Sequence, residues 1–274
     1  MYEADYYTCD SDVGYQGDYF SDRRRESLFE QARAWLAILA ETGIAVSGKV
    51  LEVGCATGEF CHTLLQECPT VDRVTGIDLS QAAIEEARSR YGDIAFEHGT
   101  IDNLEPRETY DAVFAFEVIE HLSSPDAFFR KASLLMREGA IFCLTTPNLE
   151  CGRSIGLSNW AGFSKSLEHL YFFSPAMIQQ YAARYGLKIE RTLSGGGSGS
   201  NRLIKSVKRK RVKNALKSLG VLGLLRKTRD SLRPRQGLQH DYQSEEPRHT
   251  LFMVLRRHGP ATPKCRAEAE PSDY

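Results

Sequence analysis

The first clear pattern in the chain is a repeat of apolar residues between residues 23 and 41. Its members recur at the spacing of one helix face: Leu28, Phe29, Ala32, Trp35, Leu36 and Leu39. Gly43 follows, and glycine is a typical residue at the end of a helix. We therefore predict an amphipathic helix ahead of the rest of the fold.

After this helix, short apolar runs typical of strands alternate with helical patterns. Strands are predicted at residues 49–53, 74–78, 94–97, 110–116, 139–145, 187–192 and 250–256. Helices are predicted between them at residues 59–66, 81–91, 124–137 and 174–185. Every position of 112–116 is apolar, which is typical of a strand buried on both faces. The alternation predicts an α/β fold with a parallel, doubly wound sheet and right-handed connections.

Three segments fall outside this alternation. Residues 1–22 are acidic and rich in tyrosine, and we predict either a lid over a bound ligand or an unstructured acidic tail. Residues 194–249 greatly lengthen the connection before the last strand and are predicted to form a basic helical insert. Residues 258–274 are predicted to be a disordered tail. The main domain is thus predicted to comprise residues 23–193 and 250–257.

Charge is unevenly distributed along the chain, although the net charge of its 274 residues is only −1. Residues 203–235 hold twelve Lys or Arg and one Asp, a net charge of +11. Val207, Val212, Leu216, Leu219 and Leu222 follow near-helical spacing in this segment. A cationic amphipathic helix predicts peripheral contact with an anionic membrane or a phosphate-bearing substrate. Nucleic acid is the weaker alternative because no stacking aromatics accompany the charges, and a solvated helix docked on the acidic body is another.

The cysteines and the apolar runs bear on where the protein works. The seven cysteines are scattered and none forms a CxxC pair, which favours a reduced compartment. The opening residues do not resemble a signal peptide, and no apolar run approaches the ~20 residues of a membrane span. We predict a cytoplasmic protein, with membrane contact limited to the periphery.

The first predicted strand leads into a glycine-containing loop, residues 52–58, and then a helix. Glycines allow a tight turn and close approach of a ligand, while the helix offers N–H groups to an anion. Asp78 ends the second predicted strand, twenty residues after Gly58, where an acid accepts hydrogen bonds from ribose hydroxyls in doubly wound folds. The alternative is a fold that binds NAD, but the Gly54-x-x-x-Gly58 spacing departs from GxGxxG. This pattern predicts a nucleotide-like cofactor.

These motifs resemble those of class I methyltransferases, which use S-adenosylmethionine (SAM). Residues 51–58 (LEVGCATG) resemble the first SAM-binding motif and residues 76–80 (GIDLS) the second. Residues 116–122 (FEVIEHL) and 168–174 (EHLYFFS) resemble the branch that includes the ubiquinone-biosynthesis O-methyltransferases. The resemblance implies a Rossmann-like, seven-stranded sheet whose last strand is antiparallel. It also implies SAM contacts from Glu52, Gly54, Cys55, Ala56, Thr57, Gly58, Asp78, Leu79, Thr100, Ile101 and Phe116, with Thr100 replacing an Asp common in relatives.

A second constellation follows the fourth predicted strand. If that segment is helical, Glu117, Glu120 and His121 share one face at the carboxyl edge of the sheet, where ligands bind. His169, beside Glu168, lies in another edge loop, and two carboxylates with two imidazoles can hold a divalent cation. The set also resembles the metal site of small-RNA 2′-O-methyltransferases, which implies Mg²⁺ or another divalent cation on adjacent substrate hydroxyls. The alternatives are His121 as general base, assisted by Glu117 and His169, or a structural role for His121.

The sequence therefore predicts a SAM-dependent methyltransferase that O-methylates a hydroxylated small molecule, a sugar or a lipid-linked intermediate. An RNA-terminus 2′-O-methyltransferase is the second hypothesis, and a SAM-binding sensor or scaffold without turnover is the third. Methyl transfer needs alignment and removal of one proton rather than a protein nucleophile. Residues 159–163, predicted as a loop after the fifth strand, are expected to shape the acceptor pocket, with packing of that loop as the alternative role of Trp160.

Overall fold

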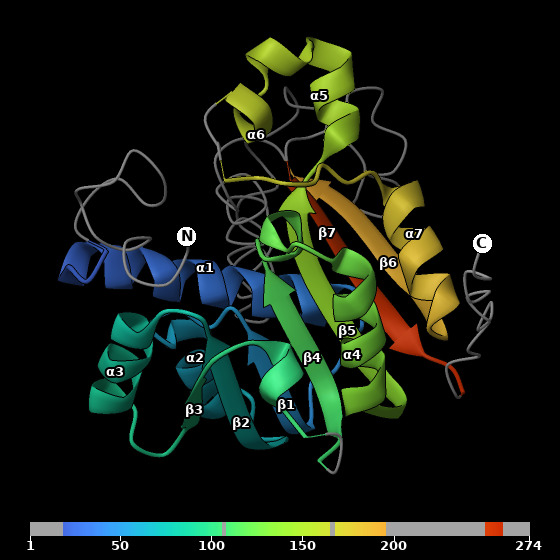
Figure 1. Ribbon diagram of the computed structural model, residues 1–274. Helices are drawn as coiled ribbons and strands as arrows, with labels where there is room; N and C mark the ends of the chain where they lie inside the picture. Colours follow the sequence, from blue (N-terminus) through green and yellow to red (C-terminus); the bar gives the residue numbers. More distant parts are fainter. Residues whose placement is uncertain (1–18, 106–107, 165–167, 196–249, 260–274) are drawn as a thin grey trace, which may run out of the picture.

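The computed structural model describes residues 19–105, 108–164, 168–195 and 250–259 (Figure 1). Its strands are β1 (Gly48–Val53), β2 (Val71–Asp78), β3 (Ala95–His98), β4 (Tyr110–Phe116), β5 (Met136–Pro147), β6 (Leu187–Gly195) and β7 (Thr250–Arg257). Its α-helices are α1 (Asp22–Glu41), α2 (Glu59–Glu67), α3 (Gln81–Arg90), α4 (Pro125–Leu135), α5 (Leu149–Ile155), α6 (Ala161–Ser164) and α7 (Pro175–Arg184). Three short 3₁₀ helices are η1 (Ile101–Asn103), η2 (Ile119–His121) and η3 (Leu157–Asn159).

All seven strands form one sheet in the order β3-β2-β1-β4-β5-β7-β6. β1 to β5 pair in parallel, whereas β7 is antiparallel to both β5 and β6. The Rossmann-like doubly wound sheet with an antiparallel last strand is thus confirmed. The order reverses between β1 and β4, which places the ligand-binding switch point of such folds at their carboxyl ends.

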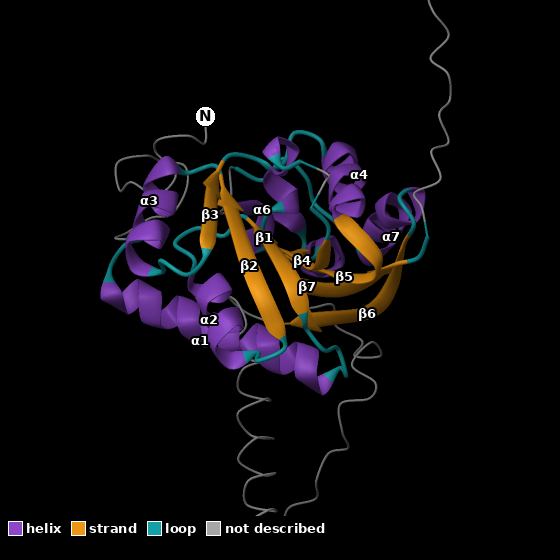
Figure 2. Cartoon of the chain, turned by 90° about the horizontal axis from the view of Figure 1, so that it is seen from below, coloured by secondary structure: helices purple, strands orange, loops and turns teal. Residues whose placement is uncertain are grey.

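Successive side chains of the central strands point alternately into two separate hydrophobic cores. In β1, Val50 faces the core covered by α1, α2 and α3, whereas Leu51 faces the core covered by α4 and α7. In β4, Phe114 and Val113 divide in the same way. Figure 2 shows the two helical layers on opposite sides of the sheet. This burial on both faces explains the continuous apolar run of β4.

Helix ends follow the capping residues. Ser21, Ser80, Ser124 and Ser174 each accept a backbone N–H in the first turn of α1, α3, α4 and α7. Pro125 and Pro175 occupy the first position of α4 and α7, where no intrahelical N–H is needed.

Within the described residues, no helix is both long and apolar enough to cross a bilayer.

Two sequence expectations about local structure were wrong. Helix α4 ends at Leu135 rather than Arg137, because Met136 already pairs with Tyr110 and begins β5. Residues 159–163, expected in a loop, instead span the end of η3 and most of α6; with α5, these helices lie above the carboxyl end of β5 in Figure 1. We call the described residues 149–164 and 168–170 the cap. A four-residue helix and a seven-residue helix carry too few turns for an apolar period to reveal them.

The predicted flanking segments lie largely outside the described residues. Residues 1–18, 196–249 and 260–274 are not described, so the lid, the basic insert and the tail remain predictions. The described margins show that α1 begins at Asp22 and that β6 continues to Gly195, into the segment predicted as insert.

Candidate functional site

The loop between β1 and α2 is fastened to the end of β2. The N–H groups of Gly54 and Cys55 both donate to the carbonyl of Ile77, at 2.8 and 3.1 Å. Ala56 has a φ of 46°, in the left-handed region that non-glycine residues rarely adopt. At Gly58, φ is 85° and a Cβ would lie 2.6 Å from Phe96 Cζ. The loop is therefore tightly constrained just before the N-terminus of α2, the place where such folds bind an anionic or polar ligand.

Asp78 connects this loop to the next one. Its Oδ2 accepts the N–H of Ala56 at 2.8 Å and its Oδ1 accepts the N–H of Ser80 at 2.9 Å. Burial raises the pKa of the carboxyl group, while these two hydrogen bonds lower it. Carboxylate oxygens have further lone pairs, so Asp78 can hold both loops and still accept a ribose hydroxyl.

Glu52 lies beneath the loop rather than at its surface. The Cys61 thiol donates to Glu52 Oε2 at 2.9 Å, and both side chains are buried. Burial raises the pKa of Glu52 to about 8, against a smaller opposing effect of the Cys61 hydrogen bond. Glu52 therefore carries a proton at pH 7 and supports the loop as a neutral group.

The other predicted cofactor residues fall into two groups. Cys55 and Thr57 lie in the loop itself, and Leu79 is an exposed apolar side chain directly after Asp78, as a face for a purine would require. Thr100 instead caps η1, where its Oγ1 accepts the N–H of Asp102. The side chains of Ile101 and Phe116 are buried in the two cores, because η1 packs on α4 and Phe116 stacks on Trp35 with 3.8 Å between ring centroids.

Tyr19 is a site residue that the sequence did not single out. It is buried, and the Arg24 guanidinium lies 5.1 Å from its ring centroid. Glu59 and Asp78 are near enough for their charges to affect the pKa of its phenol. Burial raises the pKa of the phenol; Arg24 opposes this, and the charges of Glu59 and Asp78 add to it. We call the loop between β1 and α2, residues 54–58, the cofactor loop. The last part of the N-terminal segment therefore reaches this loop. A single tyrosine among many in that segment gave no signal.

The loop after β4 carries the acidic part of the second constellation. Glu117 has a φ of 54°, and its N–H donates to the Thr145 carbonyl at 3.1 Å. Glu120 is 0% exposed, and its Oε2 accepts the hydroxyl of Thr146 at 3.0 Å. Burial raises the pKa of the Glu120 carboxyl group, and the Glu117 charge raises it further. Glu117 itself is exposed.

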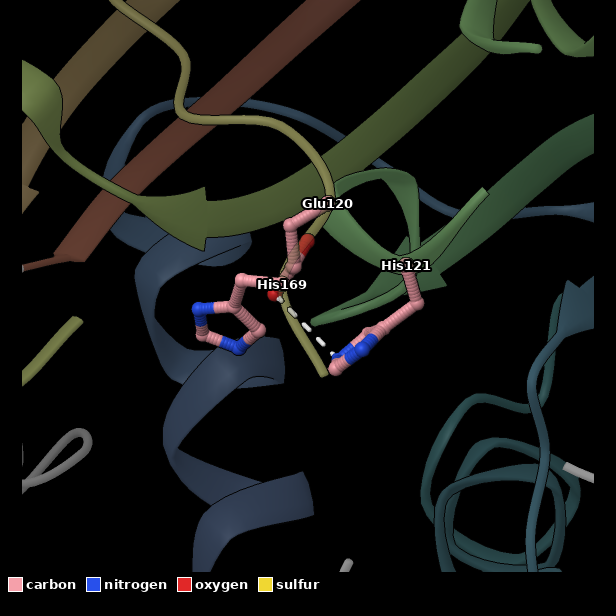
Figure 3. A group of neighbouring side chains, drawn as sticks. All are labelled: Glu120, His121 and His169. Carbon is pink, nitrogen blue, oxygen red and sulfur yellow. Dashed lines mark ion pairs between the residues drawn. The ribbon is translucent and has the colours of Figure 1, made fainter. Parts of the chain in front are cut away.

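The two histidines face Glu120 from different loops (Figure 3). His121 Nδ1 lies 3.3 Å from the Glu168 carbonyl, and His169 Nδ1 lies 2.9 Å from the Gly162 carbonyl. A carbonyl can only accept, so each Nδ1 carries the ring proton and each Nε2 has the lone pair. Burial lowers the pKa of both rings, that of His121 to about 4, with His169 contributing to the latter shift. Both imidazoles are therefore neutral at pH 7.

Glu120, His121 and His169 meet the geometric needs of a cation site. One ligand atom from each lies within 4.8 Å of the others, and His121 Nε2 is 4.0 Å from Glu120 Oε1. Ligands about 2.1 Å from one ion are at most about 4.2 Å apart, so a small side-chain movement suffices. Glu120 Oε1 is buried and no N–H or O–H among the described residues reaches it, unless Glu117 is protonated. Bonding each Nδ1 to a carbonyl is also the usual arrangement for ligating histidines.

Glu117 does not join this group. η2 begins only at Ile119, so Glu117 precedes the helical turn and the shared face expected from the sequence does not form. Its carboxyl group interacts with that of Glu120 instead. Thr146 is a further polar residue of the site that the sequence did not predict, because a threonine near a strand end has many ordinary roles.

The chain is similar to known methyltransferases in sequence and in fold. Residues 23–192 match the family model described as a methyltransferase domain. A ubiquinone biosynthesis O-methyltransferase of Rhodopseudomonas palustris is 26% identical over 158 residues, which cover 51% of this chain and 58% of the relative. A trans-aconitate 2-methyltransferase of Escherichia coli is 32% identical over 133 residues, covering 40% and 52%. The chain thus spans little more than half the length of these relatives.

The fold is shared with solved structures. Magnesium protoporphyrin IX methyltransferase from Synechocystis PCC 6803, solved with bound SAH, superposes with a TM-score of 0.53 at 16% identity. The match covers 89% of this chain and 90% of that one. Together with the glycine loop and Asp78, the family match shows that the chain belongs to the class I SAM-dependent methyltransferases.

Proposed function

We propose that this protein transfers the methyl group of SAM to a hydroxyl oxygen of a small-molecule acceptor bound at Glu120, His121 and His169. The observation that carries the proposal is the convergence of these three side chains at the carboxyl edge of the sheet. The loop after β4 that holds two of them begins beside the cofactor loop, because β1 and β4 are neighbours. An acceptor hydroxyl bound at the two Nε2 atoms would therefore lie at the same edge of the sheet as the cofactor loop.

The chemistry asks the protein for alignment and for one proton acceptor. The acceptor oxygen forms a bond to the methyl carbon as the carbon–sulfur bond breaks, and S-adenosylhomocysteine leaves. The hydroxyl proton must depart, and neutral imidazoles with lone pairs on Nε2 can hydrogen-bond that hydroxyl and take the proton. Burial favours the protonated form of Glu120 beside them, and positive charge at the rings or at a bound cation would stabilise its carboxylate.

A divalent cation fits this donor set. When bound, it would lower the pKa of a coordinated hydroxyl and offset the charge of the alkoxide. Glu120 Oε1, His121 Nε2 and His169 Nε2 would hold it, and two imidazoles with one carboxylate suit Mn²⁺, Fe²⁺ or Zn²⁺ better than Mg²⁺.

The exposed side chains of the cap support one class of acceptor. Four of the six exposed large apolar side chains of the described residues come from the cap: Ile155, Leu157, Phe163 and Leu170. Apolar side chains at this density suit an acceptor with an apolar portion better than a free sugar. The relative from Rhodopseudomonas palustris, named for ubiquinone biosynthesis and O-methylation, supports the same direction.

Metal removal tests the site directly. With methyl-labelled SAM and a cell extract as the source of acceptor, EDTA should abolish labelling, and Mn²⁺ or Mg²⁺ should restore it. Glu120→Gln should weaken Mn²⁺ binding to the isolated protein in calorimetry by at least about tenfold, whereas Glu97→Gln, on the exposed edge strand β3, should not. Full labelling in EDTA would contradict the metal and leave the imidazoles as bases.

A further inference from the structure

Trp160 is an unusual residue of the cap. It is 1% exposed and heads the fully buried side chains in size, yet it belongs to neither of the two hydrophobic cores. Its neighbours in the cap include the exposed Leu157 and Phe163. A large ring buried inside a small, largely exposed element has a local task.

The indole is held between two glycines. A Cβ at Gly162 would lie 2.6 Å from Cε2 and Cζ2 of Trp160, and one at Gly152 would lie 2.8 Å from its Cδ2. Carbon atoms do not approach so closely, so the ring fits only because both positions lack a side chain. Gly152 belongs to α5 and Gly162 to α6, and the indole therefore fixes the spacing of these two helices.

Gly162 in turn orients His169. Its carbonyl accepts the Nδ1 proton of His169 at 2.9 Å. The carbonyl of Trp160 accepts the N–H groups of Phe163 and Ser164 at 3.0 and 2.9 Å, which closes α6 around Gly162. Both ends of the peptide that bears the Gly162 carbonyl are thus set by Trp160, one through its ring and one through its backbone.

The tautomer of His169 depends on that carbonyl. With Nδ1 bonded, the lone pair is on Nε2, and the ring packs against His121 with 4.8 Å between centroids. The opposite tautomer would place an N–H where the site needs an acceptor atom. We propose that Trp160 is a positioning residue that fixes the Nδ1–H tautomer of His169 through the Gly162 carbonyl; the use of that tautomer rests on the proposed function.

Histidine tautomers can be read directly from nitrogen chemical shifts. In metal-free protein labelled with ¹⁵N-histidine, His169, assigned with the variant His169→Gln, should show the Nδ1–H form. Trp160→Ala and Gly162→Ala should each shift it toward the Nε2–H form, and Trp160→Phe, which keeps a flat ring between the glycines, should largely preserve it. Mn²⁺ affinity should fall roughly tenfold in the two disruptive variants.

Two controls separate positioning from packing. Phe129→Ala removes a fully buried ring from α4 and should lower stability without changing the His169 tautomer. Gly92→Ala adds a methyl group in open space and should change neither. An unchanged His169 spectrum in folded Trp160→Ala or Gly162→Ala would overturn the proposal, and if Trp160→Ala does not fold, Gly162→Ala decides. Because the spectra need no metal or substrate, failure of the proposed function would leave this result intact.

Discussion

Buried carboxyl groups are the residues in which local environment changes chemistry most. Glu52 lies under the cofactor loop, and Glu120 is buried within the loop after β4, so each of the two loops at the switch point has a buried acid. Burial raises the pKa of both. For Glu52, whose pKa rises to about 8, the neutral form is the one that supports the loop at pH 7.

The pH dependence of stability tests the state of Glu52. The native protein holds this proton up to about pH 8, whereas the unfolded chain releases it near the ordinary value of 4.5, so stability should fall as pH rises between these values. The limit for one group is about 1.4 kcal/mol per pH unit. In urea unfolding, the free energy of unfolding of Glu52→Gln should rise relative to that of wild type as pH increases across this window. If the free energies of unfolding of wild type and Glu52→Gln change with pH in parallel, Glu52 does not have a raised pKa. Glu97→Gln, at an exposed position, is the matched control.

Residue identities predicted where the candidate site lies, and backbone conformation explains what they missed. Gly54, Gly58, Asp78, His121 and His169 occupy the edge of the sheet expected from the motifs. Glu117 departs because its positive φ ends the strand before any helical turn begins. Among the described residues, the non-glycine residues with positive φ are Ala56 and Glu117, one on each side of the switch point, where strain is typically associated with function.

At the scale of elements, the junction of β1 and α2 depends on one glycine. Gly58 is the N-cap of α2 with a φ of 85°, and a Cβ at this position would collide with the rings of Phe96 and Tyr91. Any side chain there must strain the backbone and displace a ring.

Gly58→Ala should therefore lower the free energy of unfolding by about 1–3 kcal/mol and weaken SAM binding by more than about tenfold. Calorimetric titration with SAM and urea unfolding measure the two effects. Gly92→Ala, where φ is ordinary and space is open, should stay within about 0.5 kcal/mol of wild type. Wild-type SAM affinity in a folded Gly58→Ala would show that the loop need not hold its shape.

Long elements could be predicted because their periods are complete, whereas short ones could not. α1, with 20 residues, and β4, buried on both faces, follow the apolar pattern. α5 and α6 owe their positions to Trp160 between two glycines, a tertiary contact that no local pattern contains. The start of β5 at Met136 likewise depends on pairing with β4.

At the scale of the whole molecule, the strongest feature is the positive charge of residues 203–235, a segment outside the described residues. Its net charge of +11 predicts binding to anionic lipid. The intact chain should sediment with phosphatidylglycerol vesicles, less so in high salt, and remain in solution with phosphatidylcholine vesicles. Neutralising Lys208, Arg209, Lys210 and Arg211 together should abolish sedimentation. An intact chain that ignores phosphatidylglycerol vesicles would refute membrane contact.

The most direct test of the central claim is to follow the methyl group. The protein is incubated with methyl-labelled SAM and a cell extract, and label is counted in small-molecule, lipid, glycan, RNA and protein fractions, with the variant His121→Ala in parallel. The account predicts label in an organic-extractable small-molecule or lipid fraction, as an acid- and base-stable ether, and its loss in His121→Ala. Label in RNA would instead contradict the small-molecule acceptor and favour the RNA 2′-O-methyltransferase, and no label in any fraction despite SAM binding would contradict the proposed reaction and favour a sensor or scaffold.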